Sequence, residues 1–262
     1  MAEDHHDSEP AASGHGHNTP RGDTDTDSHA LPGGVSVAED GFQLEASETR
    51  IEPGKSSKWT YQVHDEEGNV ITEFEKTHDQ LAHLILVRRD LTRFQHLHPT
   101  LADDGTWSAE VTLPDPGVYR AFIDVLVDGQ PTTLGVDLLS SGPAQYEDRP
   151  KTTHVAEVEG YTIELTPEQF PTRETVSIEF EVRRKDGVAH LDAYLGALGH
   201  LVALRDGDLA YLHVHPEDSN SEDGVVRFAV RFPTPGRYRL FLQAKPDGEL
   251  ITTSFDVEAG EH

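Results

Sequence analysis

His83-Leu-Ile-Leu-Val-Arg-Arg-Asp-Leu-Thr-Arg-Phe-Gln-His-Leu-His-Pro99 is the stretch on which the interpretation of the fold depends, because a version of it occurs twice. The second copy is His200-Leu-Val-Ala-Leu-Arg-Asp-Gly-Asp-Leu-Ala-Tyr-Leu-His-Val-His-Pro216. Each copy has one histidine, a second histidine thirteen residues later, and a third two residues after that, followed by proline. Short apolar runs on both sides of a polar turn predict an antiparallel hairpin in each copy.

The hairpin geometry brings the histidines together. If the first copy turns at Asp90-Leu91, its centre of symmetry places His83 opposite His98. His96 shares a face with His98, because side chains two residues apart on a strand point the same way. The same geometry with a turn at Gly207-Asp208 applies to the second copy, with His200 opposite His215 and His213 on the same face.

Three imidazoles on one face of two paired strands form a ligand set that leaves a fourth position for water, a carboxylate or a partner's ligand. Asp124, on a later strand, is a candidate oxygen ligand or a group that orients a ligand. The matching position in the second copy is Gln243, a much weaker ligand, so the two sites should differ. The other interpretation is that the histidines and prolines make buried hydrogen bonds that only fix the hairpin. Lesser candidate ligands nearby are Glu75, His78, Asp79, His190, Glu217 and Asp218.

The available ligand chemistry narrows the choice of metal. The chain has no cysteine, and its one methionine is Met1. The soft sulfur ligands that select Cu(I) are therefore missing, and a transition metal must be held by imidazole and carboxylate. This favours Zn(II), Cu(II), Ni(II) or Fe, with Cu(II) and Zn(II) as the first expectations.

Alternating apolar and polar residues, separated by turn signals, run from residue 35 almost to the C-terminus. The order of strands repeats in the second half. Seven or eight short strands per repeat predict an all-β protein of two tandem immunoglobulin-like antiparallel β-sandwich domains, at residues 35–145 and 150–262. The stretch 191–198 lacks strict alternation and predicts a short helical piece.

Aromatic residues within the strands have structural interpretations. Tyr119-Arg120 and Tyr238-Arg239 occur at matching places in the two repeats. We expect each pair to supply a tyrosine corner and a surface arginine. Trp59 and Trp107 are expected in or near the core.

Residues 1–34 form an acidic tail rich in Asp, Ser, Gly, Pro and Thr, with almost no large apolar side chains. Such a segment cannot bury enough surface to offset its ordering entropy, so we expect it to be disordered. A histidine-rich flexible segment can gather metal ions loosely, although histidines in a polar tail can also lack any specific role. The histidines of the tail are His5, His6, His15, His17 and His29.

The net charge of −27 argues against nucleic acid and anionic membrane surfaces as partners, because both would be repelled. Abundant Asp and few Lys are typical of adaptation to high salt; an acidic secreted protein is the alternative. No stretch approaches the length of a membrane-spanning helix, and direct membrane insertion is not expected. The N-terminus does not resemble a signal peptide, so the chain is either cytoplasmic or a mature form.

The segments Leu195–Arg205, Gly207–Glu217 and Phe94–Pro99 resemble a family of tandem immunoglobulin-like proteins described as heavy-metal-binding, copper-associated and extracytoplasmic. The resemblance covers about residues 35–258. It implies a secreted or membrane-tethered protein that handles metal ions, with a membrane transporter or a metal-accepting protein as its partner. The chain departs from the familiar periplasmic copper carriers in having no methionine besides Met1 and no segment that resembles a signal peptide.

Catalysis is not expected. His213-Val-His215 is similar to the copper-side motif of copper–zinc superoxide dismutases, but the later His and Asp ligands and the disulfide of that family are absent. No Gly-X-Ser-X-Gly motif or phosphate-binding loop occurs either. The prediction is therefore a non-enzymatic protein that captures, buffers or delivers Cu(II) or Zn(II). The alternative is a structural or interaction β-sandwich in which the histidines serve only the hairpin.

Overall fold

The computed structural model describes residues 32–212, 214–217 and 219–260, and for His215 the backbone alone. Both repeats belong to one compact unit that begins at Leu31. The predicted disordered tail lies outside the described residues except for its last three positions. Two of these are held by hydrogen bonds: the Gly34 N–H donates to the Thr133 carbonyl (2.8 Å), and the Tyr211 N–H donates to the Gly33 carbonyl (3.0 Å).

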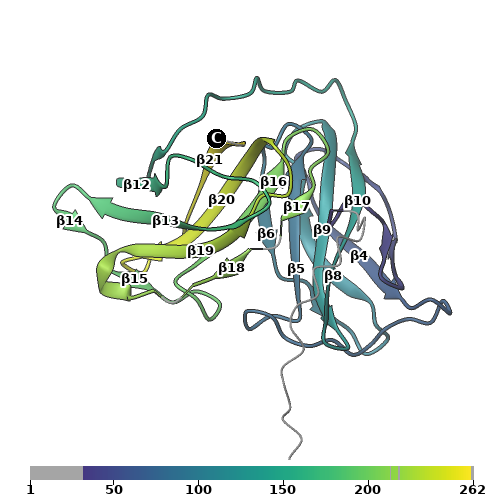
Figure 1. The fold of residues 1–262 in the computed structure, drawn as a ribbon. Coiled ribbons are helices and arrows are strands. Elements are labelled where there is room, and N and C mark those ends of the chain that lie inside the picture. The colour runs from purple at the N-terminus through teal and green to yellow at the C-terminus, as the bar shows by residue number, and fades with distance from the viewer. Residues whose placement is uncertain (1–31, 213, 218, 261–262) are drawn as a thin grey trace, which may run out of the picture. The chain divides into compact units, whose positions relative to one another are not determined.

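The first repeat is a sandwich of two five-stranded sheets (Figure 1). In spatial order, one sheet contains β1 (Ala38–Glu39), β2 (Phe42–Ala46), β4 (Ser56–His64), β8 (Trp107–Thr112) and β7 (Thr100–Leu101). The other contains β3 (Arg50–Ile51), β10 (Gln130–Ser140), β9 (Gly117–Val127), β5 (Ala82–Arg88) and β6 (Gln95–Leu97). Strand pairs are antiparallel except for β3 with β10, which are parallel.

The second repeat has the same plan, drawn in green to yellow in Figure 1. Its first sheet contains β11 (Val155–Val158), β12 (Tyr161–Thr166), β13 (Thr175–Arg184), β19 (Val225–Arg231) and β18 (His215–Pro216), with β14 (Gly187–Val188) beside β13. Its second sheet contains β15 (Leu191–Asp192), β20 (Gly236–Pro246), β16 (Gly199–Arg205) and β17 (Tyr211–Leu212), with β21 (Ile251–Ala259) beside β20. The all-β class and the tandem sandwich repeats are confirmed.

Helix is almost absent from the described residues, where a single 3-10 turn, Ser221–Asp223, occurs. The short helix predicted at 191–198 is wrong. Leu191 and Asp192 form β15, and Tyr194 then bridges to Ala197 through a tight turn. Leu195 and Gly196 both have positive φ in this turn, 52° and 79°, which a right-handed helix does not allow.

The first histidine hairpin has the predicted turn and register. Leu84 pairs with Leu97 and Ile85 with His96, so the register continues to His83 opposite His98. At the turn, the Leu91 N–H donates to the Arg88 carbonyl (2.8 Å).

The second hairpin keeps the register only in part. Ala203 pairs with Leu212, as the symmetry requires, but β17 ends there. His215 belongs to β18 of the other sheet, where its backbone pairs with Ala229. The prediction that His200 lies opposite His215 is therefore wrong, because the chain has already crossed to the other sheet.

Each sandwich encloses its own apolar core, and the aromatic residues take their expected places. Trp59 and Trp107 are fully buried. The Tyr119 hydroxyl donates to the Asp115 carbonyl (3.0 Å), and the Tyr238 hydroxyl donates to the Thr234 carbonyl (2.8 Å). These are the two predicted tyrosine corners.

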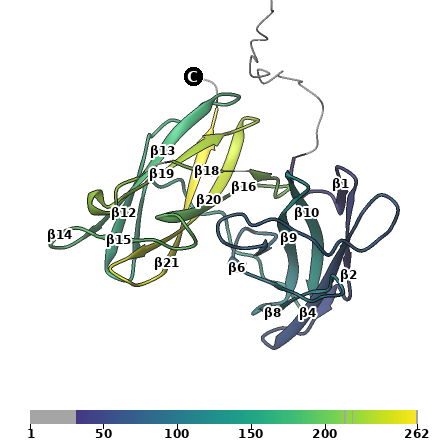
Figure 2. The same cartoon turned by 90° about the horizontal axis from the view of Figure 1, so that it is seen from below.

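Strand β5 is buried on both faces, which determines where the histidines lie. Leu84 and Leu86 point into the core of the first repeat, whereas Ile85 and Val87 belong to a separate cluster. We call this second group the apolar interface cluster, because it contains residues of both repeats. Its members are Ile85, Val87, Leu91, Phe122, Val202, Leu204, Leu209 and Phe241. The sheet with β5, β6 and β9 thus faces the sheet with β16, β17 and β20 (Figures 1 and 2).

The arginines expected at the surface are buried. Arg120 is 9% exposed and donates to the Gly34 carbonyl and to Asp137. Arg239 is 6% exposed and donates to Asp256 and to the Leu91 carbonyl of the other repeat (2.7 Å). Both lie on the sheet faces that meet at the interface, and each carries a carboxylate partner that makes its burial tolerable.

Candidate metal centre

Strands β5 and β6 bring three histidines of the first repeat together. One ring nitrogen of each of His83, His96 and His98 lies within 4.8 Å of the other two. The ring centroids are 5.1 Å apart for His83 and His96, 5.2 Å for His83 and His98, and 4.8 Å for His96 and His98. We call this group the histidine trio. It arises because His83 shares a sheet face with the paired strand's His96, and His98 follows two residues later.

With the amide of Gln243 oriented as in the structure, hydrogen bonds to neighbouring oxygens assign the proton of His83 and that of His96 to one nitrogen of each ring. The Nε2–H of His83 donates to the Thr77 carbonyl (3.0 Å). The Nδ1–H of His96 donates to Oε1 of Gln243 (2.7 Å), whose amide is held in turn by Thr252 (3.1 Å). A neutral imidazole has only one N–H. The other two nitrogens, Nδ1 of His83 and Nε2 of His96, therefore both present lone pairs, and they face each other at 2.9 Å.

His98 contributes a third available nitrogen. Its Nε2 is buried and has no hydrogen-bond partner among the residues that the structure describes. A buried polar atom without a partner costs free energy, so an additional ligand at this position is favoured.

Burial keeps the rings of His96 and His98 neutral at neutral pH. It lowers the pKa of His96 to about 3, an effect that the bond to Gln243 opposes and that His83, His98 and His200 reinforce. Burial also lowers the pKa of His98 to about 4, with a further contribution from His83. Neutral imidazoles are the form that binds metal ions, so these rings do not need to lose a proton at neutral pH.

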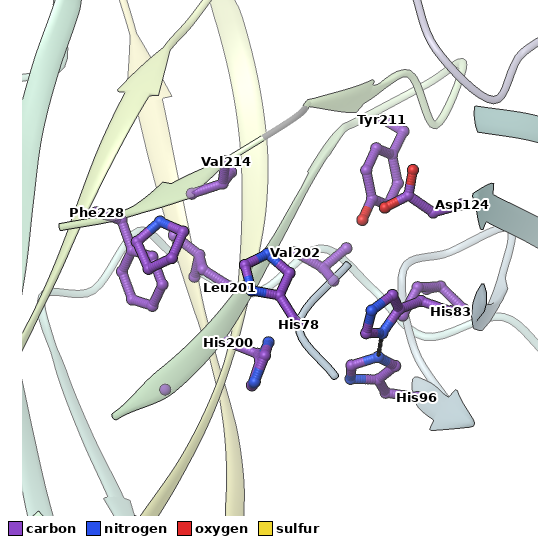
Figure 3. A pocket seen from close by; sticks show the side chains of 13 residues that line it. His78, His83, His96, Asp124, His200, Leu201, Val202, Tyr211, Val214 and Phe228 are labelled. Carbon is purple, nitrogen blue, oxygen red and sulfur yellow. Dashed lines mark hydrogen bonds between the residues drawn. The ribbon is translucent and has the colours of Figure 1, made fainter. Parts of the chain in front are cut away.

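A histidine of the second repeat lies beside the trio. His200 is 8% exposed, and its ring centroid is 6.0 Å from that of His96 and 6.4 Å from that of His83. A cavity of about 40 Å³ lies between these rings, with Tyr211 and Asp124 on its wall (Figure 3). His78, a lesser candidate in the sequence, also lines the cavity, with its ring 5.3 Å from that of His200.

The orientation of His200 repeats that of His83. Its Nε2–H donates to the Tyr194 carbonyl (2.8 Å), six residues earlier in the chain, as His83 donates to Thr77. Its Nδ1 therefore carries the lone pair. Burial lowers the pKa of His200 to about 4, against a smaller opposing effect of the bond to Tyr194.

The remaining predicted site residues are placed as follows. Asp124 lies opposite His83 on β9, lines the cavity, and accepts a hydrogen bond from the Thr133 hydroxyl (2.9 Å). His213 lies outside the described residues, and only the backbone of His215 is described. The second triplet thus remains a prediction, while its first member lies beside the trio. The sequence did not predict the contact of Gln243 with His96. It identified Gln243 only as the position in the second repeat that is equivalent to Asp124.

Comparisons with known proteins bear on the family and not on the site. A family model described as a domain of unknown function (DUF8832) matches twice, at residues 36–141 and 156–261. No curated protein sequence matches the chain. Neither of these comparisons supports the resemblance to heavy-metal-binding proteins, so metal binding stays a prediction.

Solved structures that are similar to this chain include a bacterial adhesin and tandem immunoglobulin domains. The Escherichia coli adhesin FdeC is 13% identical over 86% of this chain and 66% of that chain, with a TM-score of 0.28. Tandem immunoglobulin domains of titin are 12% identical over 85% of this chain and 97% of that chain, with a TM-score of 0.23. Scores this low carry no argument about function. Within the described residues, no helix has the length and apolar character needed to cross a membrane.

Proposed function

Since this chain belongs to the DUF8832 family, whose description names no activity, we propose a function from the histidine cluster itself: the protein binds a divalent transition-metal ion. The histidine trio supplies the ligands, as Nδ1 of His83, Nε2 of His96 and Nε2 of His98. Zn(II) and Cu(II) are the ions that such an all-imidazole set suits best in a chain without cysteine.

The observation that carries the proposal is the pair of opposed nitrogens. Nδ1 of His83 and Nε2 of His96 lie 2.9 Å apart, while the other nitrogen of each ring already donates to an oxygen. Two lone pairs at this distance repel unless a cation lies near both. A proton on His96 is a poor candidate, because burial holds the pKa of His96 at about 3. A metal ion satisfies both nitrogens, and separating them to about 3.3 Å gives tetrahedral geometry with ordinary Zn–N distances.

The oxygens that hold the rings are the groups expected around a metal site. Ligating histidines usually donate their second N–H to a main-chain carbonyl or a polar side chain, which orients the ring and makes the ligand more basic. Thr77 and Gln243 do this for His83 and His96.

The size of the cavity favours an ion over an organic ligand. Its volume of about 40 Å³ exceeds the roughly 10–15 Å³ needed to hold one water molecule, and is far below the several hundred Å³ typical of small-molecule sites. We propose capture, buffering or delivery of the ion as the role. A membrane transporter or a metal-accepting protein as the recipient, and an extracytoplasmic location, remain predictions from the resemblance.

The second candidate is a structural or interaction β-sandwich, which agrees with the immunoglobulin-like fold. The observation in its favour is that 2.9 Å is also an ordinary hydrogen-bond distance between His83 and His96. If the amide of Gln243 were turned over, its nitrogen would donate to His96, and His96 would donate to His83. The histidines would then only join β5 to β6 and to the second repeat.

The experiment that separates these functions is zinc titration by calorimetry, with thermal unfolding in EDTA and in zinc. The full chain is used with the five tail histidines changed to alanine (His5, His6, His15, His17 and His29). We expect one tightly bound ion and an increase in stability of about 2.7 kcal/mol at free zinc 100 times the Kd. His96→Ala should abolish both effects, whereas His190→Ala, an exposed histidine away from the trio, should retain both.

Two results would overturn the proposal. One is a folded chain whose unfolding midpoint does not rise with zinc, copper or nickel. The other is a His96→Ala variant that binds zinc as tightly as the parent. Lower stability of His96→Ala in EDTA, in a parent that binds no metal, would establish the structural function instead.

A further inference from the structure

We propose that His200 supplies a ligand from the second repeat, so that the bound ion clamps the two repeats together. This inference rests on the proposed metal binding. It adds that the ligand set of the histidine trio is completed by the second repeat of the same chain. The sequence pattern assigns His200 to a separate second site. The structure places it at the cavity lined by His83 and His96.

The first argument is position. His83 and His96 belong both to the histidine trio and to the cavity wall, and His200 lies on the opposite wall (Figure 3). Ring centroids of imidazoles that share a tetrahedral ion lie about 5 Å apart, given ordinary Zn–N distances. The separations of His200 from His96 and His83 are 6.0 Å and 6.4 Å. An approach of about 1 Å between the repeats would therefore bring His200 to such a separation from His83 and His96.

The second argument is orientation. His83 and His200 each donate Nε2–H to the carbonyl six residues earlier, Thr77 and Tyr194. Both rings thus keep Nδ1 as the lone-pair nitrogen. The tautomer of His200 therefore leaves a nitrogen that can bind a cation, as the tautomer of His83 does. The residue that accepts the hydrogen bond differs between the two repeats.

The third argument is the contact that surrounds the site. The apolar interface cluster lies next to the histidines on the same strands, since Ile85 follows His83 and Val202 follows His200 by two residues. Phe94 stacks on Phe241 with ring centroids 4.2 Å apart. Gln243 of the second repeat also accepts the hydrogen bond from His96 of the first (2.7 Å). These contacts hold His200 near the trio before any ion binds.

The negative charge of the chain weakens the contact between the repeats. The chain carries a net charge of −27, so its two acidic halves repel each other. A divalent cation at the interface opposes this repulsion at the point of contact. By linkage, the ion strengthens docking of the repeats by the same factor by which docking strengthens ion binding.

The test measures the distance between the repeats in the full chain with and without zinc. The chain has no cysteine, so Asp103→Cys and Asp186→Cys, both at exposed positions, accept one spin label in each repeat. Zinc is diamagnetic and leaves the spin–spin distance measurement undisturbed. His200→Gln removes the ligand and keeps a side-chain N–H for the Tyr194 carbonyl. His190→Gln is the matched control on the second repeat, exposed and paired with Glu222.

Zinc should narrow the distance distribution in the parent and in His190→Gln. In His200→Gln, calorimetry should show zinc binding weakened by roughly tenfold, in the range typical of coupled equilibria, and the distribution should no longer respond. If zinc binds the parent without narrowing the distance distribution, the proposed clamp is overturned and the proposed binding at the histidine trio is not. The clamp is also overturned if His200→Gln responds as the parent does. Absence of zinc binding in the parent overturns both the clamp and the proposed function.

Discussion

Gln243 holds His96 across the interface between the repeats, and the orientation of this single amide decides whether the His96 nitrogen that faces His83 carries a proton or a lone pair. Its side chain is 7% exposed, so water cannot easily replace it. Such orienting partners usually contribute 10- to 100-fold to metal affinity.

We therefore expect Gln243→Leu to weaken zinc binding by at least tenfold in a calorimetric titration, with an unchanged circular dichroism spectrum. Gln62→Leu, which removes a glutamine amide in the first repeat away from the trio, should leave the affinity unchanged. Equal affinities of the two variants would contradict the assigned role of Gln243.

The neutral histidines make the metal-free protein sensitive to acid. The pKa of His96 is lowered by burial from 6.5 to about 3 in the folded chain, and returns to its ordinary value on unfolding. Below pH 6.5 the unfolded chain takes up a proton that the folded chain does not, so stability is present above this pH and is lost as the pH falls. Between pH 6.5 and 4.5, His96 alone should remove about 2–3 kcal/mol, from about 1.4 kcal/mol per pH unit.

Urea unfolding in EDTA at pH 7.5, 6.5, 5.5 and 4.5 checks this dependence. The difference between the parent and His96→Gln isolates the contribution of His96, because the other titrating groups are common to both. The free energy of unfolding of the parent should fall more steeply with acid than that of His96→Gln. Parallel curves would mean that His96 is already accessible to protons in the folded state.

The members of the trio could be predicted from the sequence, but the way they are held could not. The spacing of His83, His96 and His98 in a hairpin is a local property, and period-2 alternation is enough to place them on one face. The Thr77 carbonyl and the Gln243 amide come from a loop and from the other repeat. Their positions depend on tertiary packing, which no local pattern records.

The hairpin turn between β5 and β6 is fixed by an ion pair. Nε and Nη2 of Arg88 donate to the two carboxylate oxygens of Asp90 (3.0 and 2.7 Å), and the side chains are 2% and 8% exposed. Burial would raise the pKa of Asp90, but the hydrogen bonds from Arg88, the Glu147 N–H and Thr92 lower it to about 2. In the second hairpin, Arg205 pairs with Asp208, whose side chain is 46% exposed.

Removing Asp90 leaves the guanidinium of Arg88 buried with little compensation. We expect Asp90→Ala to lower the free energy of unfolding by about 3 kcal/mol, since breaking one side of a buried pair costs about 3–5 kcal/mol and Asp115 lies 3.7 Å from Arg88 as a partial substitute. Asp208→Ala is the matched change in the second hairpin and should cost about 1 kcal/mol or less. Urea denaturation of both variants gives the comparison. A loss at Asp208 equal to that at Asp90 would show that burial does not decide the cost.

Elements with strong local signals were predicted well, and those without were not. The hairpin register follows from the symmetry about Asp90-Leu91 and matches the pairing of Ile85 with His96. The helix expected at 191–198 fails because weak alternation there marks a turn with positive φ at Leu195 and not a helix. His215 does not belong to the predicted hairpin because β17 ends at Leu212. The spacing of the histidines is the same in both repeats and does not reveal this early end.

The contact between the repeats is the feature of the whole molecule that the sequence analysis missed. Arg120 and Arg239 were expected at the surface, yet both are buried where the two sheets meet. A signal was present in β5, where Leu84 to Val87 is a continuous apolar run. Such runs are typical of strands buried on both faces. The partner of the second buried face is the matching apolar run in β16, which belongs to the same cluster and which the sequence does not reveal.

The charge of the whole chain predicts a response to salt. A net charge of −27 destabilises the compact state through self-repulsion, and salt screens it, since the Debye length falls from about 10 Å at 0.1 M to about 3 Å at 1 M. We expect the urea midpoint of the metal-free protein to rise steadily between 0.1 and 1 M NaCl. KCl at equal ionic strength should have the same effect if screening is the cause. A midpoint that falls, or that differs sharply between the two salts, would contradict this explanation.

X-ray absorption at the zinc edge shows whether imidazoles of this chain bind a transition-metal ion. The sample is the full chain without its tail histidines, loaded with one equivalent of zinc and separated from unbound ion. We expect three or four nitrogen ligands at about 2.0–2.1 Å, with the multiple scattering typical of imidazole rings. Loss of one imidazole in His200→Gln would agree with the clamp. A first shell dominated by oxygen, or a protein that loses its zinc during separation, would contradict the claim.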